Sequence, residues 1–178
     1  MKFDIKDLEH HSEIAQRLTD EALMETGVGT QGVCMISTRI AYQYLKDQGF
    51  PVRVAGGRAM FSMNSSEWGI MDFGYSEVPD IERYEKTDTI GHFWCVVAGH
   101  VVDCSLKYLV GMIARSNKAR GVNAGRIELP AKNMIRKNEI STARKLYNGK
   151  IGWHYAEIPG RGEKVWKEKP GTVKTGKF

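Results

Sequence analysis

The first part of the chain carries apolar residues at helical spacing. Such residues recur every three or four positions over residues 4–24 and again over residues 33–48, and each stretch predicts an amphipathic helix. In the second stretch the apolar stripe consists of Ile36, Ile40 and Tyr44. Gly49 favours a C-terminal cap and Pro51 lacks the amide that another helical turn needs, so the second helix is expected to stop there.

Alternating and β-branched runs follow. Residues 51–63 predict a strand with a bulge or a kink at a glycine pair, and residues 67–75 are expected to pair with it. The strongest hairpin signal is HFWCVVAGHVVDCS, residues 92–105, in which two β-branched runs flank Ala98–Gly99. We also expect a surface loop over 76–91, a short helix over 141–149 and a strand over 151–159. Helices followed by antiparallel strands predict an α+β fold.

The length and net charge of the chain limit its domain organisation and the classes of partner it is expected to bind. The 178 residues predict one domain over residues 1–160 and a basic C-terminal tail without regular structure over 161–178. Much of the formal net charge of +5 lies in that tail, which a solvated segment explains better than a nucleic-acid footprint. The N-terminus lacks the pattern of a signal peptide, and the sequence contains no apolar run of membrane-spanning length. Three cysteines without framework spacing favour a reducing compartment, so we expect a cytoplasmic protein without a membrane partner.

Three side chains form a candidate catalytic set. Cys34 opens the second predicted helix, where unpaired amide groups and the helix dipole favour the thiolate. His92 and Asp103 lie on the two strands of the predicted hairpin. A two-residue loop at Ala98–Gly99 would place both on one face as diagonal neighbours, together with Trp94. A loop one residue longer or shorter would separate them.

This set suits acyl transfer. An imidazole that takes the proton of a thiol creates the nucleophile, and a carboxylate on its second nitrogen orients the ring. Cys34 would attack an acyl carbon to form a thioester, with His92 as base and Asp103 as orienter. The backbone amide of Cys34 would be one oxyanion donor. The Gln31 side chain is a candidate second donor, and a capping or loop role accounts for it equally well.

Two runs carry a family resemblance, QGVCMISTRIAYQYLKDQGFPVRVAGG and GHFWCVVAGHVVDCS. They resemble the transglutaminase-like superfamily of papain-like cysteine enzymes, in particular its compact bacterial members, over residues 31 to about 106. The shared features are Gly-x-Cys at a helix start, Arg53 on the next strand, His92-x-Trp94, and Asp103 on a later strand. The resemblance implies a papain-like core, with N-terminal helices and the nucleophile Cys34 packed on an antiparallel sheet. It assigns nucleophile, base and orienter to the same three residues.

Two functions stay open. The first is a thiol-dependent peptidase, amidase, deamidase or transglutaminase-like enzyme that takes a peptide or small amide substrate and needs no cofactor. The second is an inactive module of the same fold that binds a peptide or nucleic acid. Trp94 is a candidate for lining a substrate cleft, with core packing as the alternative. The histidines lack zinc-ligand spacing, so no metal site is expected.

A rival nucleophile lies in Asp103-Cys104-Ser105, which resembles the Asp-Cys-Ser start of bacterial cell-wall endopeptidases. That interpretation needs a helix over residues 106–115 and His154 as the base. The run VVDCS instead predicts the end of a strand. We therefore expect Cys104, like Cys95, to be a small buried hydrophobic residue.

Overall fold

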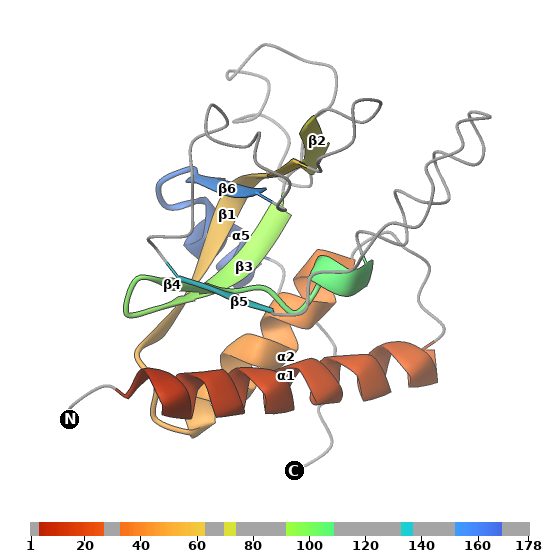
Figure 1. The fold of residues 1–178 in the computed structure, drawn as a ribbon, viewed down its shortest axis with the longest axis vertical. Helices are drawn as coiled ribbons and strands as arrows, with labels where there is room; N and C mark the ends of the chain where they lie inside the picture. Colours follow the sequence, from red (N-terminus) through yellow and green to blue (C-terminus); the bar gives the residue numbers. More distant parts are fainter. Residues whose placement is uncertain are drawn as a thin grey trace.

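The computed structural model describes residues 4–26, 33–62, 70–73, 92–108, 133–136 and 152–168. Within these ranges the fold is α+β. Two helices, α1 (Ile5–Thr26) and α2 (Val33–Asp47), precede the sheet, and α5 (Arg161–Glu168) follows it. Figure 1 shows α1 and α2 together on one side of the sheet. Both N-terminal helices agree with the expected ranges to within two residues.

The strands form one antiparallel sheet in the order β2-β1-β3-β4-β5, with β6 paired to β1. Their bounds are β1 Val52–Ser62, β2 Ile70–Phe73, β3 His92–Val97, β4 His100–Val102, β5 Met134–Ile135 and β6 Gly152–Glu157. The first half of β1 pairs with β3 and the second half with β6, so Gly57 opposes both His92 and Glu157. The long central strand β1 therefore pairs with β3 and with β6 at the same residue, Gly57.

The hairpin of β3 and β4 has the predicted register. Val97 pairs with His100, as a two-residue loop requires. Ala98 (φ 46°) and Gly99 (φ 82°) both take the left-handed conformation that suits a tight hairpin turn. This register fixes which hairpin side chains share a face.

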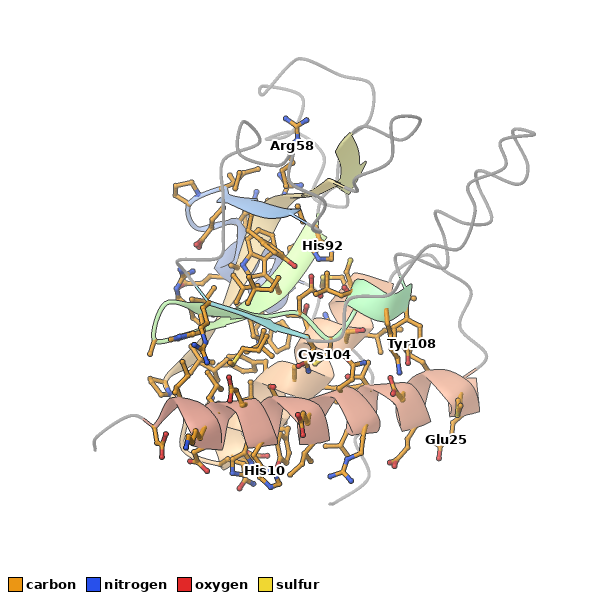
Figure 2. The ribbon with its side chains drawn as sticks, in the orientation of Figure 1. His10, Glu25, Arg58, His92, Cys104 and Tyr108 are labelled. Carbon is orange, nitrogen blue, oxygen red and sulfur yellow. The ribbon has the colours of Figure 1, made fainter. Side chains whose placement is uncertain are left out.

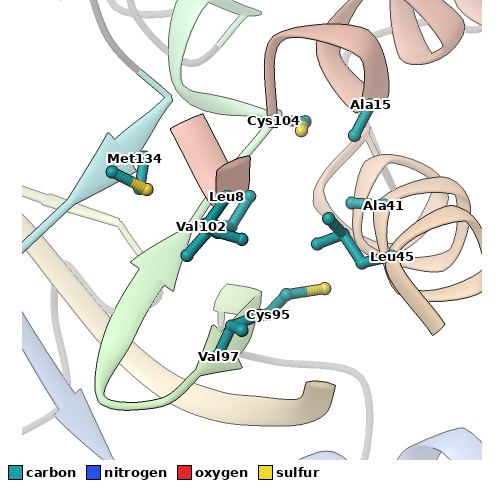
Figure 3. Close-up of a cluster of buried hydrophobic side chains, with 9 residues drawn as sticks. All are labelled: Leu8, Ala15, Ala41, Leu45, Cys95, Val97, Val102, Cys104 and Met134. Atoms are coloured by element: carbon teal, nitrogen blue, oxygen red, sulfur yellow. The ribbon is translucent and has the colours of Figure 1, made fainter. Parts of the chain in front are cut away.

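The main core lies between the helices and the sheet. Figure 3 shows its nine buried side chains: Leu8, Ala15, Ala41, Leu45, Cys95, Val97, Val102, Cys104 and Met134. Cys95 and Cys104 are buried as expected, and Figure 2 shows Cys104 between the sheet and α1. A second cluster on the other face contains Ala55, Ala59, Trp94, Val101, Leu106 and Ile135. The hairpin is thus buried on both faces, which explains its continuous apolar character.

Three features differ from the expectations. The register of β1 with β3 and β6 runs through the glycine pair with one residue opposite one, so the alternative of a bulge at this pair is wrong. The chain from Arg161 to Glu168 is helical rather than an irregular tail, since α5 packs its Trp166 ring 4.8 Å from that of Tyr42 on α2. The two-residue strand β5 was not expected at all.

Some expectations concern other parts of the chain. The predicted loop 76–91 and the predicted helix 141–149 lie outside the described residues. The strand expected over 151–159 is present as β6, and the segment 67–75 contributes β2. No helix among the described residues combines the length and apolarity that a bilayer crossing requires.

Candidate active site

The three candidate catalytic residues occupy the ends of three elements. Cys34 is the second residue of α2, His92 is the first residue of β3, and Asp103 follows the last residue of β4. Because β3 and β4 pair in the predicted register, His92 and Asp103 extend from the same end of the hairpin. Figure 2 shows His92 at this end of β3.

The His92 ring lies between the other two side chains. Its Nε2 is 2.5 Å from Oδ2 of Asp103, and the Cys34 side chain lies near enough to the ring to help raise the pKa of His92. Since Nε2 is engaged by the carboxylate, Nδ1 is the ring nitrogen that remains for the thiol. Thiol, imidazole and carboxylate therefore lie in one cluster.

Burial distinguishes the three members. His92 is 2% exposed and Asp103 is 1% exposed, whereas Cys34 is partly exposed. Cys34 is thus the one of the three residues that keeps some surface exposed among the described residues. The ring and the carboxylate behind it are shielded from water, which strengthens their electrostatic interaction.

The Asp103 carboxylate accepts further hydrogen bonds. Its Oδ1 accepts from the Ser105 amide at 3.0 Å and from the Ser105 hydroxyl at 2.6 Å. Its Oδ2 accepts from the Tyr155 hydroxyl at 2.9 Å in addition to His92. A carboxylate offers about four lone-pair positions, so this one is saturated. Such a set of donors stabilises the ionised form despite burial.

The pKa shifts agree with an ion pair. Burial lowers the pKa of His92, but the charge of Asp103 and the hydrogen bonds to Asp103 and Cys34 outweigh it and raise this pKa to about 10. Burial raises the pKa of Asp103, but His92, Ser105 and Tyr155 outweigh it, so this pKa lies below its ordinary value. At neutral pH the pair is an imidazolium facing a carboxylate.

Two contacts set the position of α2 along β3. The Thr38 hydroxyl donates to the carbonyl of Phe93 at 2.9 Å, and the Cys95 thiol donates to the carbonyl of Thr38 at 3.5 Å. Thr38 lies one helical turn after Cys34, and Phe93 is adjacent to His92. The contacts therefore tie the start of the helix to the start of the strand and hold the thiol near the ring.

The two further candidates have different outcomes. Trp94 is 1% exposed and stacks beside His92, with ring centroids 5.9 Å apart and an interplanar angle of 25°. Its side chain is thus packed against the imidazole, which agrees with core packing, the default expectation for this residue, rather than with the lining of a substrate cleft. Gln31 lies outside the described residues.

The rival nucleophile has an unsuitable environment. Cys104 is 1% exposed, and burial raises the pKa of its thiol to about 12 although Asn133 donates a hydrogen bond to the sulfur. A buried thiol of this kind stays protonated and unreactive at neutral pH. The helix expected over 106–115 and the His154 side chain lie largely outside what the structure describes. In the described ranges, no group of three or more His, Cys, Asp or Glu side chains could hold a metal ion.

Sequence reasoning missed two partners of Asp103. Ser105, two residues after an aspartate, is a position from which side chain and amide commonly bond back to the carboxylate, so local sequence contained that signal. Tyr155 lies 52 residues away on β6, and only the pairing of β6 with β1 brings it to the site. Arg53 is also partnered, since its guanidinium forms a bidentate ion pair with Glu157 of the same strand β6.

Comparisons with known proteins identify the fold alone. No protein-family model matches the chain, and no curated protein matches its sequence. A solved structure described as "The crystal structure of genomics APC5867" superposes with a TM-score of 0.57 at 12% sequence identity. The match covers 91% of this chain and 73% of the other. At this identity the likeness concerns the arrangement of the backbone.

Proposed function

We propose that this protein is a thiol-dependent acyl-transfer enzyme with a papain-like, transglutaminase-like core. Cys34 is the nucleophile, His92 the general base and acid, and Asp103 the orienter. The observation that carries the proposal is the His92 ring, which is bonded to a buried, saturated carboxylate and interacts electrostatically with the partly exposed residue Cys34. The substrate class is a peptide or a small amide.

The proposed reaction proceeds by two acyl transfers. In the reactive state His92 holds a proton on Nδ1 as well as on Nε2 and Cys34 is the thiolate, which attacks the amide carbonyl carbon while the carbonyl π electrons move to oxygen. The tetrahedral intermediate collapses as the C–N bond breaks, and the amine leaves with the proton from Nδ1. Water or a second amine then attacks the thioester and gives a proton to Nδ1. The C–S bond breaks and the thiolate forms again.

The helix start also provides an oxyanion donor. Amides in the first turn of a helix have no carbonyl partner four residues earlier. The Cys34 amide is in this position as the second residue of α2. It therefore supports the charge that develops on the substrate oxygen beside the attacking sulfur.

Selective alkylation tests the proposal. Iodoacetamide at pH 6, followed by mass spectrometry, should label Cys34 quickly, although an ordinary thiol with a pKa of about 8.5 is almost wholly protonated there. Cys95 and Cys104 are internal controls, because burial raises the pKa of both thiols. His92→Gln should slow the labelling of Cys34, whereas the matched variant His11→Gln on α1 should not.

The same reaction separates the two functional hypotheses. If Cys34 reacts at pH 6 no faster than a free thiol, the enzyme proposal is wrong and a binding module becomes the better interpretation. If Cys34 is fast, incubation with amide and ester panels should give an adduct on Cys34. The mass of that adduct identifies the acyl group, and its transfer to an added amine distinguishes transferase from hydrolase.

A further inference from the structure

One face of β1 forms a floor of small residues beneath the site. Ala55, Gly57 and Ala59 are buried and point to the same face, because they alternate along the strand. Ala55 pairs with Trp94, Gly57 with His92, and Ala59 with Tyr155. Two neighbouring strands therefore place three rings above side chains no larger than a methyl group.

Tyr155 completes this group of rings. Its ring lies 4.9 Å from that of Trp94 in an edge-to-face arrangement and 6.3 Å from that of His92. Edge-to-face packing fixes the plane of a ring and adds to its burial energy. The ring plane in turn fixes the hydroxyl, which donates to Oδ2 of Asp103 at 2.9 Å.

We propose that Tyr155 is a positioning residue of the candidate active site, whose hydroxyl holds the Asp103 oxygen that also holds His92. The proposal rests on the proposed function. In this role Tyr155 acts through the Asp103 carboxylate, to which its hydroxyl donates. A rigid donor on β6 keeps Oδ2 aimed at Nε2, so that Nδ1 stays aimed at the sulfur.

The alternative sources of that hydrogen bond are few. Asp103 is 1% exposed, and Ser105 already supplies both donors to Oδ1. Loss of the Tyr155 hydroxyl would leave Oδ2 with His92 as its one donor among the described residues. A buried carboxylate with fewer donors takes up a proton more readily.

The other titratable groups near Asp103 stay neutral, so they do not obscure a change in the pKa of Asp103. Cys95 on β3 and Cys104 after β4 both interact with its charge, but burial and that charge raise the pKa of both thiols, so they stay neutral. Burial and Asp103 likewise raise the pKa of Tyr155 well above its ordinary value. Among the described groups near Asp103, proton uptake at low pH is therefore confined to the bonded pair of His92 and Asp103.

The test is the pH profile of Cys34 alkylation in the full chain. Tyr155→Phe keeps the ring and removes the donor, so the acid limb of the profile should move upward by about one pH unit. Tyr44→Phe is the matched control, because the Tyr44 hydroxyl pairs with His11 away from the site at 2.8 Å, and its profile should equal that of the wild type. In an Asp103→Asn background the Tyr155→Phe change should have no further effect.

The outcomes separate the two proposals. A wild-type Cys34 that reacts like a free thiol overturns the proposed function and the role of Tyr155 with it. A fast wild type with an unmoved acid limb in folded Tyr155→Phe overturns the role of Tyr155 alone. If that variant does not fold, the chain is produced with 3-fluorotyrosine, whose more acidic phenol is a stronger donor. The acid limb should then move downward, and an unmoved limb overturns the positioning role.

Discussion

Asp103→Asn tests the buried ion pair through stability, without relying on activity. The change is best made in a Cys34→Ala background, so that titration of the thiol does not contribute. It leaves His92, 2% exposed, facing a neutral amide instead of a carboxylate. Removal of one partner of a buried pair costs about 3–5 kcal/mol, a large fraction of the stability of a domain this size.

The pH dependence of that loss follows from the pKa shifts. With the carboxylate present, the pKa of folded His92 is about 10, above its ordinary value of 6.5. The stability from this pair is therefore complete below pH 6.5 and is lost as the pH rises through 10. The pKa of Asp103 is lowered from 3.8, so the stability that its ionised form contributes is lost only as the pH falls through the pKa of Asp103 in the folded protein. Without the carboxylate, burial alone acts on His92 and lowers its pKa, so the variant loses stability as the pH falls below 6.5.

The stability difference should therefore be largest near pH 5. Between pH 7 and pH 9 it should shrink by about 1 kcal/mol per pH unit. Urea denaturation followed by circular dichroism at pH 5, 7 and 9 measures it. Asp20→Asn is the control, because the Asp20 carboxylate bonds to Lys107 and Tyr108 and to no histidine among the described residues. A loss for Asp103→Asn that is equal at pH 5 and pH 9 would refute the ion pair.

Two further substitutions probe how the fold positions the site. Thr38→Val keeps the shape of the side chain and removes the bond to the Phe93 carbonyl, so it should lower stability by about 1 kcal/mol and slow Cys34 alkylation. Thr19→Val, which removes a buried bond within α1, should lower stability without slowing alkylation, and equal alkylation rates in both variants would contradict the role of Thr38. Gly57→Ala would place a methyl group 2.1 Å from the Ala156 carbonyl, so β6 must shift and the cost should reach about 3 kcal/mol by denaturation. The new methyl group of Gly56→Ala would lie 2.8 Å from the Phe93 ring. This substitution should therefore lower the free energy of unfolding by less than Gly57→Ala does. A larger loss for Gly56→Ala would show that the backbone of β6 is not what restricts Gly57.

Local sequence pattern was sufficient to predict the N-terminal helices and the hairpin of this fold. The two N-terminal helices follow from apolar spacing, and the hairpin register follows from Ala98–Gly99, because a two-residue loop permits few alignments. That register alone places His92 and Asp103 on one face of the hairpin. The helix α5 was missed because its residues are mostly polar and its stability comes from packing Trp166 on α2.

The surroundings of the site could not be predicted from the sequence. Burial of Trp94 depends on which elements cover the sheet face that it shares with Ala55 and Ala59, and composition alone does not specify them. The partnership of Tyr155 with Asp103 depends on the pairing of β6 with β1, which joins segments nearly a hundred residues apart in the sequence. Pairings of such separation leave no local signal.

The candidate chemistry follows from local sequence, because a cysteine at a helix start and a histidine and an aspartate on one hairpin are short-range features. The environment of these three residues depends on how the chain packs. The contact of Thr38 with β3, the burial of His92 and Asp103, and the donor from Tyr155 all join distant segments. The physical reason is that local propensity acts over a few residues, whereas burial and the resulting pKa shifts arise only when separate elements exclude water together.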